Sequence, residues 1–233
     1  MNDEDYKEYI ELKNWFAETA DEPCEEMGSF FDRRIQDYEE HMRFWYEHYK
    51  RVAELVPGDA ESLLDLGSGT GLELDRIFER RPDISVTAID LSDEMISKLL
   101  SKHGHRALNV IKDDYFRHDF GENRFDAAVS VESLHHFTAE KKVGLFKSIC
   151  RALKPGGIYI ECDYIANNSE IEELAFAECL RRRKRDNIPD DRYIHFDTPL
   201  TLEHELAAML SGGFSEASLV ENLDGTPIII AKK

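Results

Sequence analysis

From residue 62 onward, short apolar runs alternate with amphipathic stretches. The apolar runs have the length and composition of buried strands and cover residues 62–66, 85–90, 109–112, 125–131 and 158–165. Amphipathic segments with helical spacing lie between them, at residues 72–80, 93–102 and 140–153. Because strands that alternate with helices form a parallel sheet covered on both faces, the pattern predicts an α/β fold with a doubly wound sheet.

Two segments lack this strand pattern. Residues 3–56 are acidic, rich in aromatic side chains and helical in spacing, and Pro23 and Gly28 separate a first helix from later ones. Residues 170–185 read as a charge-rich helix, and an irregular stretch follows at 187–199. We expect the two segments to pack together as a lid over a ligand pocket, since lids exclude water and select substrates.

The C-terminal part of the chain predicts one more helix and a hairpin. Residues 202–210 are helical in spacing, with Thr201 as the N-cap and Gly212-Gly213 as the stop; Ser92 is a similar N-cap for the helix at 93–102. Two short apolar runs, 217–220 and 227–231, flank a turn at Asp224-Gly225 and read as an antiparallel pair.

The expected architecture is therefore a Rossmann-like, seven-stranded and mostly parallel sheet that ends in an antiparallel hairpin. A length of 233 residues suits one such domain with an elaboration. We divide the chain into an N-terminal helical region, residues 1–60, and a sheet domain, residues 61–233, with a helical insertion at 166–200.

Composition narrows the partners and the compartment. The formal net charge of -19 repels nucleic acid and anionic membranes at long range. No run approaches the ~20 apolar residues of a membrane span, and the acidic start of the chain lacks the order of a signal peptide. The four cysteines form no CxxC pair, which suits a reducing compartment. We expect a cytoplasmic protein with no membrane partner.

A glycine-rich loop, Asp65-Leu66-Gly67-Ser68-Gly69-Thr70-Gly71, follows the first strand and opens a helix. Glycine permits positive φ and a close approach of a ligand to the backbone, and the helix N-terminus offers free N–H groups. Asp90 ends the second strand at the spacing where an acid can accept both hydroxyls of a ribose. These features together predict a nucleoside-containing ligand.

The order of the loop separates two cofactor classes. Dinucleotide-binding loops run G-x-G-x-x-G, whereas this loop runs acid-x-G-x-G-x-G. An acid ahead of the loop would repel a pyrophosphate but suits an α-ammonium group. S-adenosylmethionine carries that ammonium, a ribose and no phosphate, so the loop favours it over the cofactor of a nicotinamide-dependent oxidoreductase.

These motifs resemble those of the class I S-adenosylmethionine-dependent methyltransferases, in particular the small-molecule-type group with a generic methyltransferase domain. The resemblance covers residues 62–233. The matching segments are residues 63–71 and 88–90 for the first two motifs, 113–115 for the adenine acid, 125–137 for the fourth motif, 153–160 for the turn and fifth strand, and 213–231 for the reversed last strand.

The resemblance assigns cofactor-binding roles by position. Gly67 and Gly69 would line the methionine end together with the neighbouring loop positions Ser68 and Gly71, and Asp65 would lie near the ammonium. 

The same resemblance places the nucleoside on residues after the next strands. Asp90 would hold the ribose, Leu91 would pack on the adenine, and Asp114 would accept from the adenine amine with Tyr115 beside it; Asp113 remains an alternative to Asp114.

Three further residues complete the implied site. Ser130 and Val131 would lie near the sulfonium, and Tyr38 would fold over the cofactor.

Catalytic residues are harder to predict, because methyl transfer is an in-line displacement from an activated donor and needs mainly alignment. His135 and His136 follow the fourth strand at the sheet edge where ligands bind. Adjacent residues point in different directions, so we expect one to face the pocket and one to pack; a structural role for both is the alternative. The weaker candidates are Glu132, Asp163, Tyr164 and His195.

No spacing in the sequence signals a metal site; His103 and His105 lie in a charged loop and read as solvated. The run Arg181–Arg185 reads either as a charged helix face that balances nearby acids or as an anion site.

The function expected from these features is methyl transfer from S-adenosylmethionine to a small molecule, with S-adenosylhomocysteine as the product. The alternatives are an enzyme of tRNA wobble-uridine modification, including a carboxy-S-adenosylmethionine synthase, and a cofactor-binding module without chemistry. Aromatic side chains before residue 62 would also support a homodimer.

Overall fold

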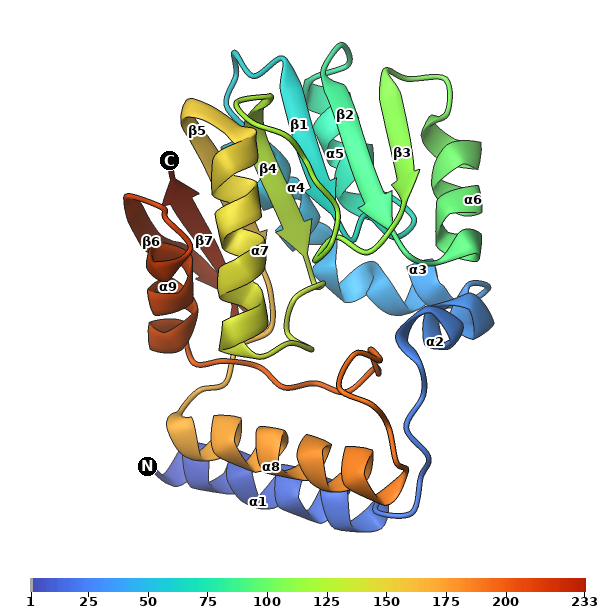
Figure 1. Ribbon diagram of the computed structural model, residues 1–233, viewed down its shortest axis with the longest axis vertical. Coiled ribbons are helices and arrows are strands. Elements are labelled where there is room, and N and C mark those ends of the chain that lie inside the picture. The colour runs from blue at the N-terminus through green and yellow to red at the C-terminus, as the bar shows by residue number, and fades with distance from the viewer. Residues whose placement is uncertain (1) are drawn as a thin grey trace.

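A seven-stranded sheet in the order β3-β2-β1-β4-β5-β7-β6 forms the centre of the computed structural model, which describes residues 2–233 (Figure 1). The parallel strands are β1 (Ser62–Leu66), β2 (Ser85–Asp90), β3 (Leu108–Lys112), β4 (Phe125–Val131) and β5 (Leu153–Cys162). The last two, β6 (Glu216–Leu223) and β7 (Thr226–Lys232), form a hairpin antiparallel to β5. The predicted mostly parallel sheet with a reversed C-terminal hairpin is confirmed.

Helices cover both faces of the sheet, because successive strand residues point to opposite sides. One face packs against α4 (Tyr46–Leu55), α5 (Leu72–Arg80) and α6 (Asp93–His103). The other packs against α7 (Ala139–Ala152) and α9 (Leu202–Ser211). Within β1, Leu63 belongs to the first layer of core residues, whereas Leu64 and Leu66 belong to the second.

The predicted caps and the hairpin turn are present. The Ser92 hydroxyl accepts the N–H of Met95 at 3.1 Å and begins α6, and Thr201 accepts the N–H of His204 at 3.3 Å and begins α9. The hairpin turns at Asp224 and Gly225, whose φ angles of 49° and 92° suit a two-residue turn between antiparallel strands.

Two predicted boundaries are wrong. The fifth strand was expected at residues 158–165 but runs from Leu153 to Cys162. Its pairing with β4 shifts between Phe125 and Ala127, so residues 154–157 form a bulge inside the strand. Gly28 does not precede a helix but lies inside α2 (Met27–Arg34), which the Glu26 carboxylate caps by accepting the N–H of Ser29.

The N-terminal helices and the insertion lie beyond the carboxyl ends of the parallel strands (Figure 1). There α1 (Asp3–Glu18) packs side by side with α8 (Ser169–Arg185), and α2, α3 (Tyr38–His41) and the 3-10 turn η1 (Met42–Trp45) lie closer to the sheet. A small core of their own joins Phe16, Ala175, Ile194 and Phe196. Within residues 2–233, none of the helices combines the length and apolarity needed to cross a membrane.

Candidate functional site

The loop between β1 and α5 owes its shape to three left-handed glycines, Gly67, Gly69 and Gly71. A Cβ on Gly67 would lie 2.0 Å from the Ser133 hydroxyl oxygen, and one on Gly71 would lie 2.5 Å from a methyl carbon of Leu99 in α6. Neighbouring side chains therefore leave no space for a Cβ at Gly67 or at Gly71. Gly69 is open, since the nearest atom to its Cβ position is the Tyr38 hydroxyl oxygen at 3.5 Å.

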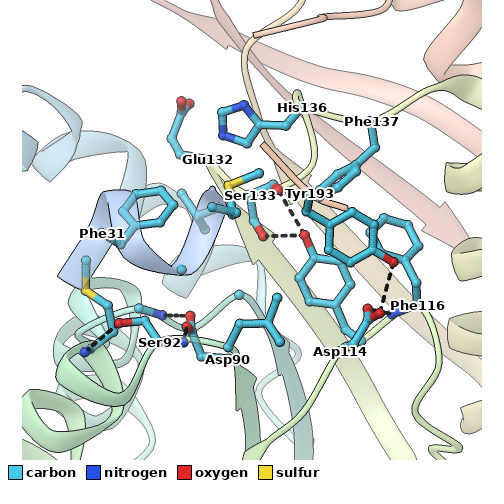
Figure 2. Close-up of a pocket in the computed structure, with 18 of the residues that line it drawn as sticks. Phe31, Asp90, Ser92, Asp114, Phe116, Glu132, Ser133, His136, Phe137 and Tyr193 are labelled. Atoms are coloured by element: carbon cyan, nitrogen blue, oxygen red, sulfur yellow. Dashed lines mark hydrogen bonds between the residues drawn. The ribbon is translucent and has the colours of Figure 1, made fainter. Parts of the chain in front are cut away.

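A cavity lies at this loop, where the carboxyl ends of β1, β2 and β4 meet (Figure 2). Eight of the predicted cofactor residues line it, namely Tyr38, Gly67, Gly69, Asp90, Leu91, Asp114, Tyr115 and Val131. Its wall also contains residues that the sequence analysis did not select, including Met27, Phe31, Ser92, Met95, Ser133 and Tyr193. Ser92 was identified only as a helix cap, and Ser133 adjoins a predicted strand, so sequence pattern alone gave them no ligand-binding signal.

Asp90 ends β2 with its carboxylate at the rim of the cavity (Figure 2). One of its oxygens accepts the N–H of Gly69 at 2.9 Å, and the other accepts the N–H of Ser92 at 2.8 Å. Burial raises the pKa of Asp90, while these backbone donors lower it. Each oxygen keeps further acceptor capacity, so the carboxylate is fixed in place and still able to receive ligand hydroxyls.

Of the two neighbouring acids after β3, Asp114 lines the cavity and Asp113 does not. Asp114 accepts the Phe116 N–H and the Tyr193 hydroxyl, each at 2.9 Å. The Asp113 carboxylate is exposed and contacts the His118 ring at 2.7 Å. The structure thus directs Asp114 into the cavity (Figure 2) and leaves Asp113 outside it.

Four of the residues expected at the cofactor lie outside this cavity: Asp65, Ser68, Gly71 and Ser130. For Ser130 the reason is the alternation of β4, which points Val131 to the cavity side and buries the Ser130 hydroxyl against the Tyr159 hydroxyl at 2.7 Å. For Gly71 the reason is that the Leu99 and His103 side chains of α6 lie against it.

The Asp65 carboxylate is buried beneath the loop, and neither of its oxygens has a hydrogen-bond partner. Burial and the nearby Glu73 raise its pKa well above the usual value. Ser68 is buried in the same region, and its hydroxyl also lacks a hydrogen-bond partner. Asp65 can therefore influence a ligand only through the loop above it.

A second cavity of about 570 Å³ adjoins the first. Four residues line both cavities: Phe31, Tyr38, Glu132 and His136. The remaining wall of the second cavity comes from α2, α3, η1, the insertion and the residues that follow β4 and β5, and includes Arg34, Trp45, His135, Tyr164, His195 and Asp197. Five of the six predicted catalytic candidates, His135, His136, Glu132, Tyr164 and His195, therefore meet around one space, and the sixth, Asp163, lies behind His135.

The two adjacent histidines differ from the expectation that only one would face a pocket, because both line the second cavity. The Nδ1 of His135 is hydrogen-bonded to an Asp163 oxygen, and the other Asp163 oxygen accepts the Leu134 N–H at 2.6 Å. Although burial alone would lower the pKa of His135, the Asp163 carboxylate raises it to about 9. Burial and the neighbouring His135 lower the pKa of His136.

Glu132 occupies the junction of the cavities in a strained conformation. Its φ of 50° is in the left-handed region, which a non-glycine residue adopts at a cost of about 1–3 kcal/mol. Burial and the nearby Asp163 raise its pKa to about 8, and its Oε1 has no hydrogen-bond partner. Strain of this kind is typical of functional sites.

Comparison with known proteins agrees with this geometry. A family model described as a methyltransferase domain matches residues 63–157, which include the glycine loop, Asp90, Asp114 and both histidines. Over residues 63–157 the chain therefore matches a methyltransferase domain of the class I S-adenosylmethionine-dependent type. The cofactor of this class is S-adenosylmethionine.

The relatives of this chain vary in reaction. A phosphoethanolamine N-methyltransferase of Plasmodium falciparum is 25% identical over 179 residues, which cover 74% of this chain and 65% of that enzyme. A carboxy-S-adenosyl-L-methionine synthase of Nautilia profundicola is 24% identical over 231 residues, covering 90% of this chain and 93% of that protein. The chain thus spans just under two thirds of the first relative and almost all of the second.

Solved structures show the same fold. An O-methyltransferase family protein from Burkholderia thailandensis superposes on 97% of this chain and on 70% of its own chain, with a TM-score of 0.70 and 18% identity.

The arginine run at the end of α8 joins this helix to α1. Arg182 is buried and donates to the Thr19 hydroxyl at 2.7 Å and to the Phe16 carbonyl at 3.3 Å, while Glu178 accepts from Arg181 and Arg182. The structure therefore supports the interpretation of this run as a charged helix face, with bonds that fasten α8 to α1.

Proposed function

We propose that the protein transfers the methyl group of S-adenosylmethionine to a small-molecule acceptor held in the second cavity. The observation that carries this proposal is the shared wall formed by Phe31, Tyr38, Glu132 and His136. In-line displacement requires the acceptor atom to face the donated methyl group, and two adjoining cavities can hold the two reactants in that relation.

The first cavity fits the cofactor by its chemistry. Asp90 presents an immobilised carboxylate for the two ribose hydroxyls, and Asp114 presents a second carboxylate for the adenine amine. Leu91 and Tyr115 supply apolar surface between these acids. Gly69, whose missing side chain leaves space below Tyr38, allows the methionine portion to approach the backbone.

The residues at the shared wall are the candidates for contact with the acceptor. Glu132 and His136 line both cavities, and each has a buried polar atom without a hydrogen-bond partner. Either side chain can accept a proton from a nucleophile that carries one. His135 lines only the acceptor cavity, where Asp163 fixes the orientation of its ring, so we assign it a positioning role.

We further propose that α1, α8 and the loop after α8 act as a lid over the acceptor. The loop residue Tyr193 donates to Asp114 in the cofactor cavity, and the nearby His195 and Asp197 line the acceptor cavity. One loop therefore contacts both cavities, which would link its closure to the presence of both reactants.

Turnover of isotopically labelled S-adenosylmethionine tests the proposal. Mixtures of amines, phenols, thiols and carboxylic acids are supplied as acceptors, and products are identified by mass. We expect a labelled methyl group on an acceptor, one S-adenosylhomocysteine formed per product, and loss of both in Asp90→Ala. Label transfer that Asp90→Ala leaves unchanged would contradict the proposal.

A second candidate reaction modifies the cofactor itself. The near full-length similarity to a carboxy-S-adenosyl-L-methionine synthase favours it. The same mass measurement separates the two reactions, because a modified cofactor retains its sulfonium, whereas methyl transfer releases S-adenosylhomocysteine.

A further inference from the structure

Two histidines and one aspartate converge at the inner wall of the acceptor cavity. The Asp197 Oδ1 lies 3.1 Å from the His136 Nδ1 and 3.6 Å from the His135 Nε2. One ligand atom from each residue falls within 4.8 Å of the other two. Two imidazole nitrogens and one carboxylate oxygen form a donor set that suits divalent transition metals.

The ring of His135 is oriented as a metal ligand requires. Its Nδ1 is hydrogen-bonded to Asp163, which leaves Nε2 directed toward Asp197. Asp163 is itself held by the Leu134 N–H and carries little exposed surface. A carboxylate that fixes the far nitrogen of a ligating histidine is the usual arrangement behind a metal site.

His136 supplies an independent observation. Only 2% of its side chain is exposed, and its Nδ1 has no hydrogen-bond partner even though a carboxylate oxygen lies 3.1 Å away. A buried polar atom without a partner carries a desolvation cost of about 1–3 kcal/mol. A cation between His136 and Asp197 would satisfy both atoms at once.

The surroundings favour positive charge and leave room for a further ligand. The buried Asp163 carboxylate lies behind His135, in contact with its Nδ1. The Arg34 guanidinium on the same cavity wall is paired with Glu25. Three protein ligands leave coordination positions open, and here these would face the acceptor cavity rather than the protein interior.

We propose that His135, His136 and Asp197 bind a divalent transition-metal ion of the zinc, iron or cobalt type at the wall of the acceptor cavity. The site differs from the cofactor cavity, and its existence does not depend on the proposed methyl transfer. Its open positions would take an oxygen, nitrogen or sulfur atom of the acceptor, because such an ion binds these atoms and lowers the pKa of a coordinated group.

Metal titration of the chelator-treated, tag-free full chain tests the site in the absence of any methyl donor. Zinc is titrated by calorimetry, and cobalt is followed by its visible absorption. We expect one ion per chain, and a loss of affinity of about ten-fold or more in His136→Gln and in Asp197→Asn. Asp163→Asn, which alters only the residue behind His135, should weaken binding by about ten- to a hundred-fold.

His118→Gln is the matched control, because His118 also pairs with an aspartate, Asp113, but lies on the surface away from both cavities. It should bind zinc as the wild type does. Thermal unfolding of each variant confirms that the fold is kept, and Asp197→Asn changes a side chain that is 51% exposed. The proposal is overturned if the wild type binds no stoichiometric ion, or if Asp197→Asn binds as tightly as the wild type.

Cofactor binding is measured separately on the same samples. A protein that binds zinc but not S-adenosylmethionine would uphold the metal site and refute the proposed function, so the two failures are distinguishable.

Discussion

Neighbouring acids in this protein have different surroundings, and the backbone decides which of them can meet a ligand. Asp113 and Asp114 follow the same strand, yet only Asp114 turns into the first cavity, where Tyr193 and the Phe116 N–H hold it. Asp113 instead contacts His118 at the surface. Both residues are aspartates, so the residue type does not show which one meets a ligand, whereas the orientation of the side chains does.

This orientation predicts different effects of two matched substitutions on cofactor affinity. Asp114→Ala should weaken S-adenosylhomocysteine binding about ten-fold or more, since a hydrogen bond to a charged group contributes about 1.5–3 kcal/mol. Asp113→Ala should leave the affinity within about two-fold of the wild type, as surface changes usually have small effects. Calorimetry of both variants is the measurement, and the reverse order of effects would place the adenine beside Asp113.

A second residue-scale feature is the pair of buried carboxyls under the glycine loop, Asp65 and Glu73. Burial raises the pKa of each, to about 7 for Glu73, and Asp90 raises that of Asp65 further. The nearby Lys102 opposes this rise at Glu73 by lowering its pKa. The folded protein therefore binds more protons than the unfolded chain between the unfolded pKa values, near 4, and the folded values.

The contribution of this pair to the free energy of unfolding therefore decreases as pH rises from about 4 through about 7, the range in which the folded protein holds the extra protons. Asp65→Asn should raise the unfolding free energy at pH 8 and flatten this part of the pH dependence. Urea unfolding at pH 5 and pH 8 measures this. A variant that is less stable than the wild type at pH 8 would show that Asp65 has a stabilising partner.

At the scale of elements, β4 and the loop that follows it supply most of the chemistry. Alternation along β4 sends Val131 to the cofactor cavity and Ser130 into the core beside Tyr159. The loop then places Glu132 and His136 at the junction of the two cavities. The carboxyl end of β4 and its loop therefore face the expected sites of both the cofactor and the acceptor.

The sequence predicts these elements well where local pattern determines them. The periodicity of apolar residues was sufficient for the sheet and the hairpin, and Ser92 and Thr201 identified two helix starts. The local pattern failed at the bulge in β5, because the sequence of residues 154–157 is typical of a turn and the bulge depends on pairing with β4. It also missed Asp197, because only the fold brings this residue from the insertion to His136.

The interface of α1 with α8 leads to an element-scale prediction. Arg182→Met removes the bonds from α8 to Thr19 and to the Phe16 carbonyl, so amide hydrogen exchange in residues 3–18 should accelerate about ten-fold or more. Arg181→Met is the matched control, because half of that side chain is exposed and its shortest bonds are to Glu178 within the same helix. Equal exchange in the two variants would mean that Arg182 does not hold α1.

At the scale of the whole molecule, the two cavities lie where the sheet topology predicts a ligand. The chain order places β1 beside both β2 and β4, and crevices at such a reversal of strand order bind ligands in open α/β sheets. The helical layer of α1, α2 and α8 lies beyond the same carboxyl edge (Figure 1). The formal charge of -19 makes an acidic partner such as nucleic acid less suited to this protein than a small molecule.

Calorimetric titration of the full chain with S-adenosylmethionine, S-adenosylhomocysteine and NAD tests the central claim most directly. The loop order, the carboxylates of Asp90 and Asp114 and the family of residues 63–157 predict that the first two ligands bind with one site per chain. They also predict that NAD does not bind, because the loop order differs from the G-x-G-x-x-G order of dinucleotide-binding loops. Binding of NAD without binding of the two sulfur-containing ligands would contradict the account.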